Sequence, residues 1–211
     1  MAMFIRTLFT DPRSFAAMTL IVVFSICVHE YLHAWVALKM GDPTAADRGH
    51  LTMNPFKQMG WISLLMLAFL GIAWGQVPVN PDNLPTRKAR IAVALAGVCG
   101  NLLLSAGFLL LAFLTLISAQ QQEFALHMLI YGSMINLVLF MLNIMPVPGL
   151  DGFLIVREFI HLHSASAMEK ANVVFFILMM LLFFSLDHIS AAASHVIFSI
   201  LHLLYSLWGG A

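Results

Sequence analysis

Long apolar segments are the feature that most constrains how this chain can fold. A helix that crosses a bilayer needs about 20 mostly apolar residues. The composition agrees with several such helices, since 61% of the residues are hydrophobic and only 9% are charged, whereas a soluble domain carries about 25% charged residues. The sequence predicts an all-α polytopic membrane protein with about five to six transmembrane helices. The clearest candidate spans are 15–38, 91–118, 124–145, 171–186 and 189–208.

The apolar run WISLLMLAFLGIAW at 61–74 is shorter than these spans and contains a glycine near its end. Its length favours a re-entrant or interfacial piece over a crossing helix. Three prolines in the next stretch, 75–90, favour an extended edge or loop. We interpret residues 1–211 as one domain, with a core at about 15–155 and additional C-terminal helices at about 171–208.

The distribution of basic residues predicts an orientation. Ten Lys and Arg balance ten Asp and Glu, so nothing in the charge indicates nucleic acid. If 61–74 does not cross, all eight Lys and Arg of the stretch 39–90 and of the loop 146–170 lie on one side. By the positive-inside rule that side is cytoplasmic. Arg6 and Arg13 then face the opposite side, against the rule.

The motif HEYLH at 29–33 places three ionisable side chains inside the first apolar segment. His29 and His33 are four residues apart and so share one helix face, where both imidazoles can ligate one zinc ion. Glu30 then stands beside the metal as a general base. Because ionisable groups within a span are costly and usually functional, the motif favours a metal site over packing.

Two histidines leave a catalytic zinc site one protein ligand short. Most other acidic residues lie either at span ends on the opposite side of the membrane or among polar neighbours. Asp42 and Glu158 belong to the second group and are interpreted as solvated. Asp151 is the second-last residue of NIMPVPGLDG at 143–152. In this stretch the prolines break a helix and the glycines allow a tight turn. Asp151 meets the histidines only if 15–38 and 124–145 run in the same direction. The charge distribution requires the same topology.

These residues resemble the site-2 protease family of intramembrane zinc metalloproteases, in its small prokaryotic type without PDZ or CBS domains. The resemblance covers about 28–152 and departs from the family pattern at His50 and Val98. Its motifs are HEYLH at 29–33, GDPTAADRGHLTMNP at 41–55, WGQVPVNP at 74–81, AGVCGN at 96–101 and NIMPVPGLDG at 143–152.

The resemblance implies one zinc ion per chain and a site near the cytoplasmic side of a prokaryotic inner membrane. It also implies an extended, membrane-dipping segment after the HExxH helix, whose edge accepts a substrate strand. The implied residues are His29, His33 and Asp151 as ligands, Glu30 as base, Asn143 toward the oxyanion, and Asn101, Val77, Pro78, Val79 and Asn80 toward the substrate.

The predicted function is an intramembrane zinc endopeptidase that cleaves transmembrane segments of membrane proteins within the lipid bilayer. An alternative is a metal-ion transporter or channel that uses the His/Glu/Asp cluster as a transit site. The absence of repeat-like halves in the sequence disfavours a transporter. An inactive scaffold is disfavoured because the ligands and the base are all present. No oligomeric state is predicted.

Overall fold

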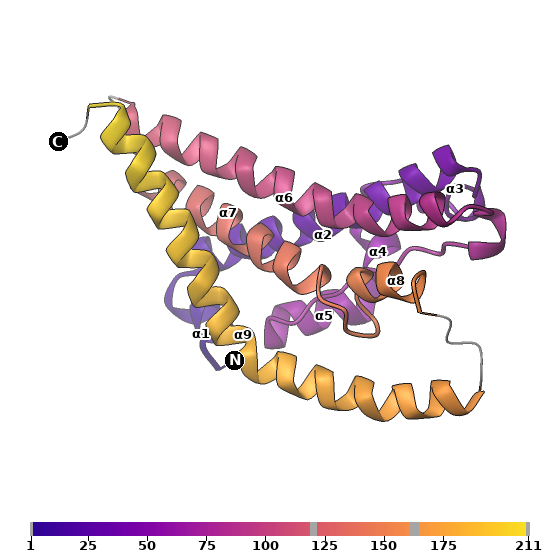
Figure 1. Cartoon of the computed structure of the whole chain (residues 1–211). Helices are drawn as coiled ribbons and strands as arrows, with labels where there is room; N and C mark the ends of the chain where they lie inside the picture. The colour runs from indigo at the N-terminus through magenta and orange to yellow at the C-terminus, as the bar shows by residue number, and fades with distance from the viewer. Residues whose placement is uncertain (1, 119–121, 161–164, 210–211) are drawn as a thin grey trace.

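Three long helices, α2 (Pro12–Met40), α6 (Arg87–Ile117) and α7 (Glu123–Asn143), form the centre of the fold in a computed structural model (Figure 1). The structure describes residues 2–118, 122–160 and 165–209. Across these ranges the structure is helical, with no strand, and four helices are long and apolar enough to span a membrane. The predicted fold class is confirmed, with fewer candidate spans than the five to six expected.

Helices α2 and α6 are antiparallel. His33 lies against Val93, and His29, one turn earlier in α2, lies against Asn101, two turns later in α6. Small residues on α6 allow this close approach, since a side chain at Gly100 would overlap Leu32. The pairing places the end of α2 and the start of α6 at the same end of the molecule.

Helices α6 and α7 are also antiparallel, with Ser105 against Ser133 and Asn101 against Asn136. Since α2 and α7 both run opposite to α6, they run in the same direction. The sequence prediction for the spans 15–38 and 124–145 is therefore confirmed. The ends of α2 and α7 that carry the predicted ligand motifs come together as a consequence.

The apolar run at 61–74 forms α5 (Gly60–Leu70), which ends at Gly71 in a left-handed conformation with φ 70°. Eleven residues rise about 16 Å along a helix axis, half of the roughly 30 Å hydrocarbon thickness. Helix α5 by itself is therefore too short to span the hydrocarbon region, as the length of the apolar run predicts. It packs through Leu67 against a cluster with Ile26 and Cys27 of α2.

The C-terminal spans predicted separately at 171–186 and 189–208 belong to one helix, α9 (Ala165–Leu207). No proline or glycine lies between them, so helical hydrogen bonding continues through the polar Asp187–His188 junction. Helix α9 bends sharply, and its second half crosses the other helices (Figure 1). Ile189, Ala193 and Ile197 of this half are buried against α6 and α7.

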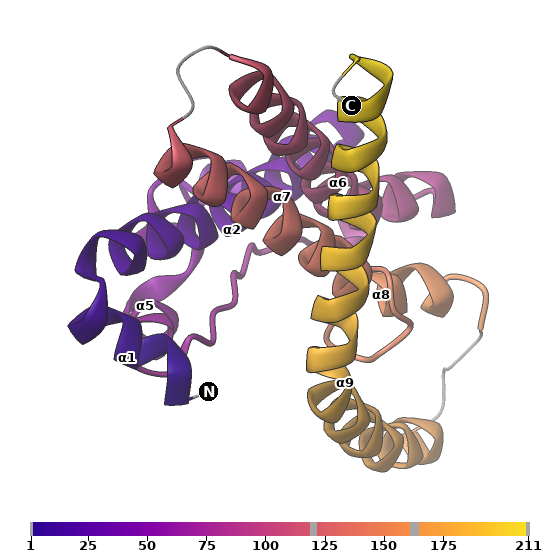
Figure 2. The same ribbon diagram turned by 90° about the vertical axis from the view of Figure 1, so that its left-hand side faces the viewer.

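Around this centre, α1 (Ala2–Thr10) and α5 lie on one side, and α8 (Asp151–Arg157) and α9 lie on the other (Figure 2). The extended segment 72–80 follows α5 and leads to α6. The remaining short helices are α3 (Thr44–Asp47), α4 (Pro55–Gln58) and the 3₁₀ turn η1 (Pro81–Asn83).

Candidate metal centre

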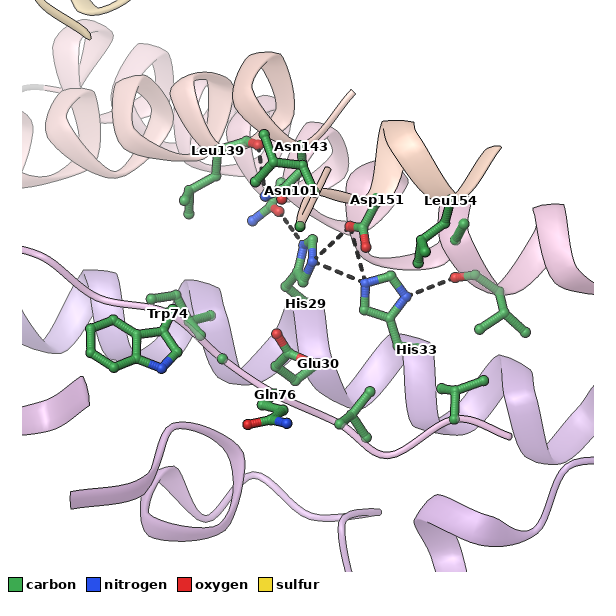
Figure 3. Close-up of a pocket in the computed structure, with 18 of the residues that line it drawn as sticks. His29, Glu30, His33, Trp74, Gln76, Asn101, Leu139, Asn143, Asp151 and Leu154 are labelled. Atoms are coloured by element: carbon green, nitrogen blue, oxygen red, sulfur yellow. Dashed lines mark hydrogen bonds and ion pairs between the residues drawn. The ribbon is translucent and has the colours of Figure 1, made fainter. Parts of the chain in front are cut away.

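His29, His33 and Asp151 meet at the centre of the fold (Figure 3). The two Nε2 atoms lie 3.0 Å apart, and Oδ2 of Asp151 lies 3.1 Å from Nε2 of His29 and 3.2 Å from Nε2 of His33. Both histidines are buried, at 8% and 6% exposure. The structure thus brings together three residues that the sequence predicts as ligands, across 118 positions of the chain.

The loop after α7 positions Asp151. Pro146 and Pro148 stop the helix, and the chain turns back through Gly149 at φ 94° to begin α8 with Asp151. A side chain at Gly152 would overlap the backbone of Ile144, so a glycine there lets α8 pack directly against the end of α7. The predicted helix break therefore delivers the carboxylate to the histidines.

Backbone contact fixes the orientation of the His33 ring. Its Nδ1 lies 2.7 Å from the carbonyl oxygen of Val93, which can only accept a hydrogen bond. Nδ1 of His33 therefore carries a proton and donates it to Val93. Nε2, the atom that faces His29 and Asp151, is then the ring nitrogen that is free to ligate a metal.

The donor atoms of these three residues fit a zinc ion. Ligand atoms about 2.0–2.2 Å from a tetrahedral zinc lie roughly 3.3–3.6 Å from one another, close to the 3.0–3.2 Å observed. On α6, Gly97 faces the cluster, and a Cβ at this position would overlap Nε2 of both histidines. The absence of a side chain at Gly97 thus keeps the space in front of the donor atoms open.

The electrostatics of Asp151 favour a carboxylate. Burial by itself would raise the pKa of Asp151, but hydrogen bonds from His29 and His33 outweigh burial and hold this pKa well below its ordinary value. Three donor atoms this close together need a positive charge among them. A divalent cation held among the three donor atoms would supply it.

Glu30 lies between His29 and the extended segment 72–80 (Figure 3). Its side chain is 8% exposed and lines the same cavity as the three candidate ligands. A Cβ at Gly75 would overlap the Glu30 carboxyl group, so the backbone of the extended segment packs directly on it. The predicted base therefore lies beside the cluster and outside the set of three converging atoms.

The candidate ligands line a cavity of about 570 Å³ between α2, α6, the extended segment and α8. Val77 and Val79 line it, as the prediction of a substrate edge requires, while Pro78 and Asn80 are not among its lining residues. The backbone N–H of Asn80 instead donates to Oδ2 of Asp42 at 2.7 Å. Whether a substrate contacts any of these four residues stays a prediction.

Asn143 and Asn101 also line the cavity, but both amides already have partners. Nδ2 of Asn143, at the last residue of α7, donates to the carbonyl of Leu139 at 3.0 Å. Asn101 is fully buried, with its Oδ1 at 2.6 Å from Nδ1 of His29. The structure thus places Asn101 as a partner of a candidate ligand, while its predicted substrate contact is untested.

Two acidic residues that sequence reasoning interprets as solvated are structural. Asp42 is fully buried and accepts hydrogen bonds from Thr44, Asn80 and Asn83. These bonds outweigh the effect of burial, which alone would raise the pKa of Asp42, and hold that pKa below its ordinary value. Because two of these partners, Asn80 and Asn83, lie 38 and 41 positions away along the chain, local polarity did not predict its burial.

Glu158 is the second of these residues. Its carboxylate pairs with Arg90 of α6 at 2.7 Å, and its side chain is only 10% exposed. The hydrogen bond from Arg90 lowers the pKa of Glu158 below its ordinary value. The predicted solvated role is wrong because α8 packs back against the start of α6.

The fold and the cluster together define a polytopic α-helical membrane protein with a candidate His/His/Asp metal centre. Among known proteins, the chain is 34% identical over 176 residues to "Putative zinc metalloprotease YwhC" of Bacillus subtilis, an alignment that covers 80% of each chain. It is 28% identical to "Putative zinc metalloprotease Rip2" of Mycobacterium tuberculosis, over 82% of this chain and 70% of that protein.

A Rip2 protein of Mycolicibacterium smegmatis is 27% identical over 76% of this chain and 65% of its own length. No family model and no solved structure matches the chain. The identity to the Bacillus protein over most of both chains is sufficient to assign a family. The chain belongs to the family of zinc metalloproteases that includes YwhC.

Proposed function

We propose that this protein is an intramembrane zinc endopeptidase of the site-2 protease type, which cleaves transmembrane segments of membrane proteins. The observation that supports this proposal most strongly is the convergence of His29, His33 and Asp151, with Glu30 beside them, in a fold with four helices long and apolar enough to span a bilayer. A metal site at this depth has access to peptide bonds that soluble proteases do not reach.

In this proposal, His29, His33 and Asp151 hold one zinc ion. When bound, zinc polarises a substrate carbonyl and lowers the pKa of a coordinated water molecule. Glu30 accepts the proton of the attacking water and returns it to the amine of the leaving peptide. Its buried position beside Gly75 keeps bulk water away from the carboxylate, which strengthens its interaction with nearby charges.

The extended segment 72–80 supports a role in substrate binding. The backbone N–H of Trp74 donates to Oγ of Ser63, and Ser63 donates to the carbonyl of Trp74. The N–H of Gln76 donates to the carbonyl of Gln58 at 2.9 Å. In extended chain, alternate residues direct their backbone groups to opposite edges. Trp74 and Gln76 therefore attach one edge of the segment to the rest of the protein.

The odd-numbered residues Gly75, Val77 and Val79 direct their N–H and C=O groups to the other edge. Within the described ranges, none of these three N–H groups donates to another part of the protein. All three residues line the cavity of the metal centre. We infer that an unwound substrate segment pairs with this edge as an added strand, so that its backbone passes the cluster in extended form.

Unwinding is required because a helical peptide bond is shielded by its own hydrogen bonds and side chains. Asn143 is the last residue of α7 and lines the cavity of the cluster. Its amide nitrogen carries two hydrogens, and only one of them is used in the bond to Leu139. We propose that this amide stabilises the oxyanion, as the family resemblance implies.

We propose that the metal centre lies toward the cytoplasmic side of the membrane. Lys39 lies in the last turn of α2 and Arg87 begins α6, at the same end of two antiparallel helices. Arg87 also contacts the carbonyl of Glu158, the residue that follows α8, so α8 belongs to that end. The concentration of positive charge there agrees with a cytoplasmic location.

A reconstitution experiment separates the protease from a metal transporter. Full-length protein in lipid vesicles would be given zinc and candidate single-span substrates, and peptide cleavage and zinc flux would be measured in parallel. The proposal predicts cleavage of at least one substrate without zinc flux above that of empty vesicles. Zinc flux without cleavage would support the transporter and contradict the proposed function.

A further inference from the structure

Three fully buried polar side chains connect the three central helices behind His29. Ser25 lies on α2, Asn136 on α7 and Asn101 on α6, and each has 0% exposure. Nδ2 of Asn136 lies 2.8 Å from Oγ of Ser25, and its Oδ1 lies 3.0 Å from Nδ2 of Asn101. Oδ1 of Asn101 then contacts Nδ1 of His29 at 2.6 Å.

The partners of Asn136 determine which way its amide points. Its Nδ2 lies 2.8 Å from the carbonyl oxygen of Gly132, a group that only accepts hydrogen bonds. Ser25 donates its own hydroxyl hydrogen to the carbonyl of Ile21, which leaves its oxygen to accept from Asn136. Both neighbours therefore require the nitrogen of Asn136 on their side, and its oxygen must face Asn101.

The orientation of the Asn136 amide fixes the orientation of the Asn101 amide, which in turn fixes the tautomer of His29. Because the oxygen of Asn136 can only accept, the nitrogen of Asn101 must face it, and the oxygen of Asn101 must face His29. Nδ1 of His29 is then the donor and carries a proton. The lone pair of His29 is left on Nε2, the atom that lies 3.1 Å from Oδ2 of Asp151.

We propose that Asn136 is a positioning residue for the metal centre, which selects the ligating tautomer of His29 through Asn101. The inference rests on the proposed function in that the ligated metal is zinc. Asn136 has no place in the cavity lining and acts only through its neighbour. His33 needs no further residue behind its partner, because the backbone carbonyl of Val93 can only accept a hydrogen bond.

The hydrogen-bond chain is needed because an asparagine amide can rotate. If Asn136 offered no acceptor, Asn101 could turn its nitrogen toward His29, and Nδ1 of His29 would then have to accept. The proton of His29 would move to Nε2, where it blocks the metal. Loss of a partner behind a metal-binding histidine typically weakens metal affinity about 10–100-fold.

The same pair of helices offers a matched control. Ser105 and Ser133 each donate to the other's backbone carbonyl at 2.8 Å, one turn from the asparagines and similarly buried. Their hydrogen bonds also join α6 to α7 but have no connection to His29. Replacement of both serines by alanine therefore tests the effect of weaker packing between α6 and α7 while the hydrogen-bond chain from Asn136 to His29 stays intact.

The experiment uses the full chain in detergent with ¹⁵N-labelled histidine. Protonation of Nδ1 of His29 would be read by NMR in metal-free protein, and zinc affinity by competition with a chromogenic chelator. Asn136→Leu is expected to remove the proton from Nδ1 of His29 in part of the molecules and to weaken zinc binding about 10–100-fold. The double serine variant, which keeps the acceptor of Asn136, is expected to retain both properties.

Unchanged protonation of His29 in Asn136→Leu would overturn the inference, as would an equal loss of zinc affinity in the double serine variant. If Asn136→Leu does not fold, Asn136→Ala, which also removes the acceptor toward Asn101, decides the question in the same way. If the wild type binds no zinc, the proposed function fails. The NMR signal of His29 still decides the inference, since it is measured without metal.

Discussion

Arg90 and Glu158 join the start of α6 to the end of α8, with Nε and a terminal nitrogen of Arg90 at 2.8 and 2.7 Å from the same carboxylate oxygen. Arg90 also donates to the carbonyl of Leu84 at 2.7 Å. Helix α8 carries Asp151 at its other end. The ion pair therefore holds the third candidate ligand against the helix that faces the two histidines.

Glu158→Gln is expected to weaken zinc binding modestly, because the α8 helix loses its charged partner on α6. The Arg90 side chain is 30% exposed, and pairs of this kind contribute up to about 1 kcal/mol, or roughly fivefold in affinity. Chelator competition would measure the change. Lys88→Gln, which alters an exposed residue in the first turn of α6, is the control and is expected to bind zinc normally. Equal effects of the two variants would exclude a specific role for the ion pair.

Gly97→Ala is expected to interfere with the metal directly, since the new Cβ would overlap Nε2 of both histidines. Overpacking of this kind costs about 1–3 kcal/mol, which corresponds to roughly 5–150-fold weaker zinc binding. Gly107→Ala is a matched control on the same helix, where a Cβ would meet nothing within 4 Å. Normal zinc affinity in Gly97→Ala would show that the space in front of Gly97 is not the metal site.

The edge of the extended segment can be tested by removal of a single backbone donor. Val77→Pro deletes the N–H that faces the cavity edge, and proline suits extended backbone. We expect zinc binding to be retained and cleavage to slow by about fivefold or more, as loss of one hydrogen bond of about 1 kcal/mol predicts. Val77→Ala keeps the N–H and controls for the side chain. Cleavage at the wild-type rate by Val77→Pro would contradict strand addition at this edge.

Asp42 anchors the far end of this segment through the N–H of Asn80. Asp42→Ala is expected to speed hydrogen exchange at Asn80, measured by mass spectrometry, while Asp47→Ala, in an exposed position of the same region, should not. The pKa of Asp42 is lowered in the folded protein, so its stabilising effect is present above the unfolded pKa of about 3.9 and is lost as pH falls through the folded value. Asp42→Ala should therefore reduce the acid sensitivity of this region. An unchanged exchange rate at Asn80 would remove Asp42 as the anchor.

The parts of the centre that depend on local pattern were predictable from the sequence. The spacing of His29 and His33 fixes a shared helix face, and the prolines before Asp151 require a break in the helix at that point. The direction of the spans followed from the charges and from the need to bring these ends together. The structure agrees with each of these local predictions.

The partners behind the site were not predictable, because they depend on which helices pack together. Asn136 bonds a neighbouring helix, as polar residues within a span commonly do, but its link through Asn101 to His29 requires the register of α6 against both α2 and α7. The burial of Asp42 depends likewise on contact with the distant Asn83. Hydropathy also cannot distinguish two C-terminal spans from one bent helix such as α9.

The role of Glu30 is the most direct test of the proposed function. Glu30→Gln keeps the shape of the side chain and the three candidate ligands but removes the base. Cleavage of a reconstituted single-span substrate by Glu30→Gln would be compared with the wild type at equal, measured zinc content. The proposed function predicts that Glu30→Gln binds zinc normally and cleaves about 10²–10⁴-fold more slowly. Cleavage at the wild-type rate by zinc-loaded Glu30→Gln would contradict it.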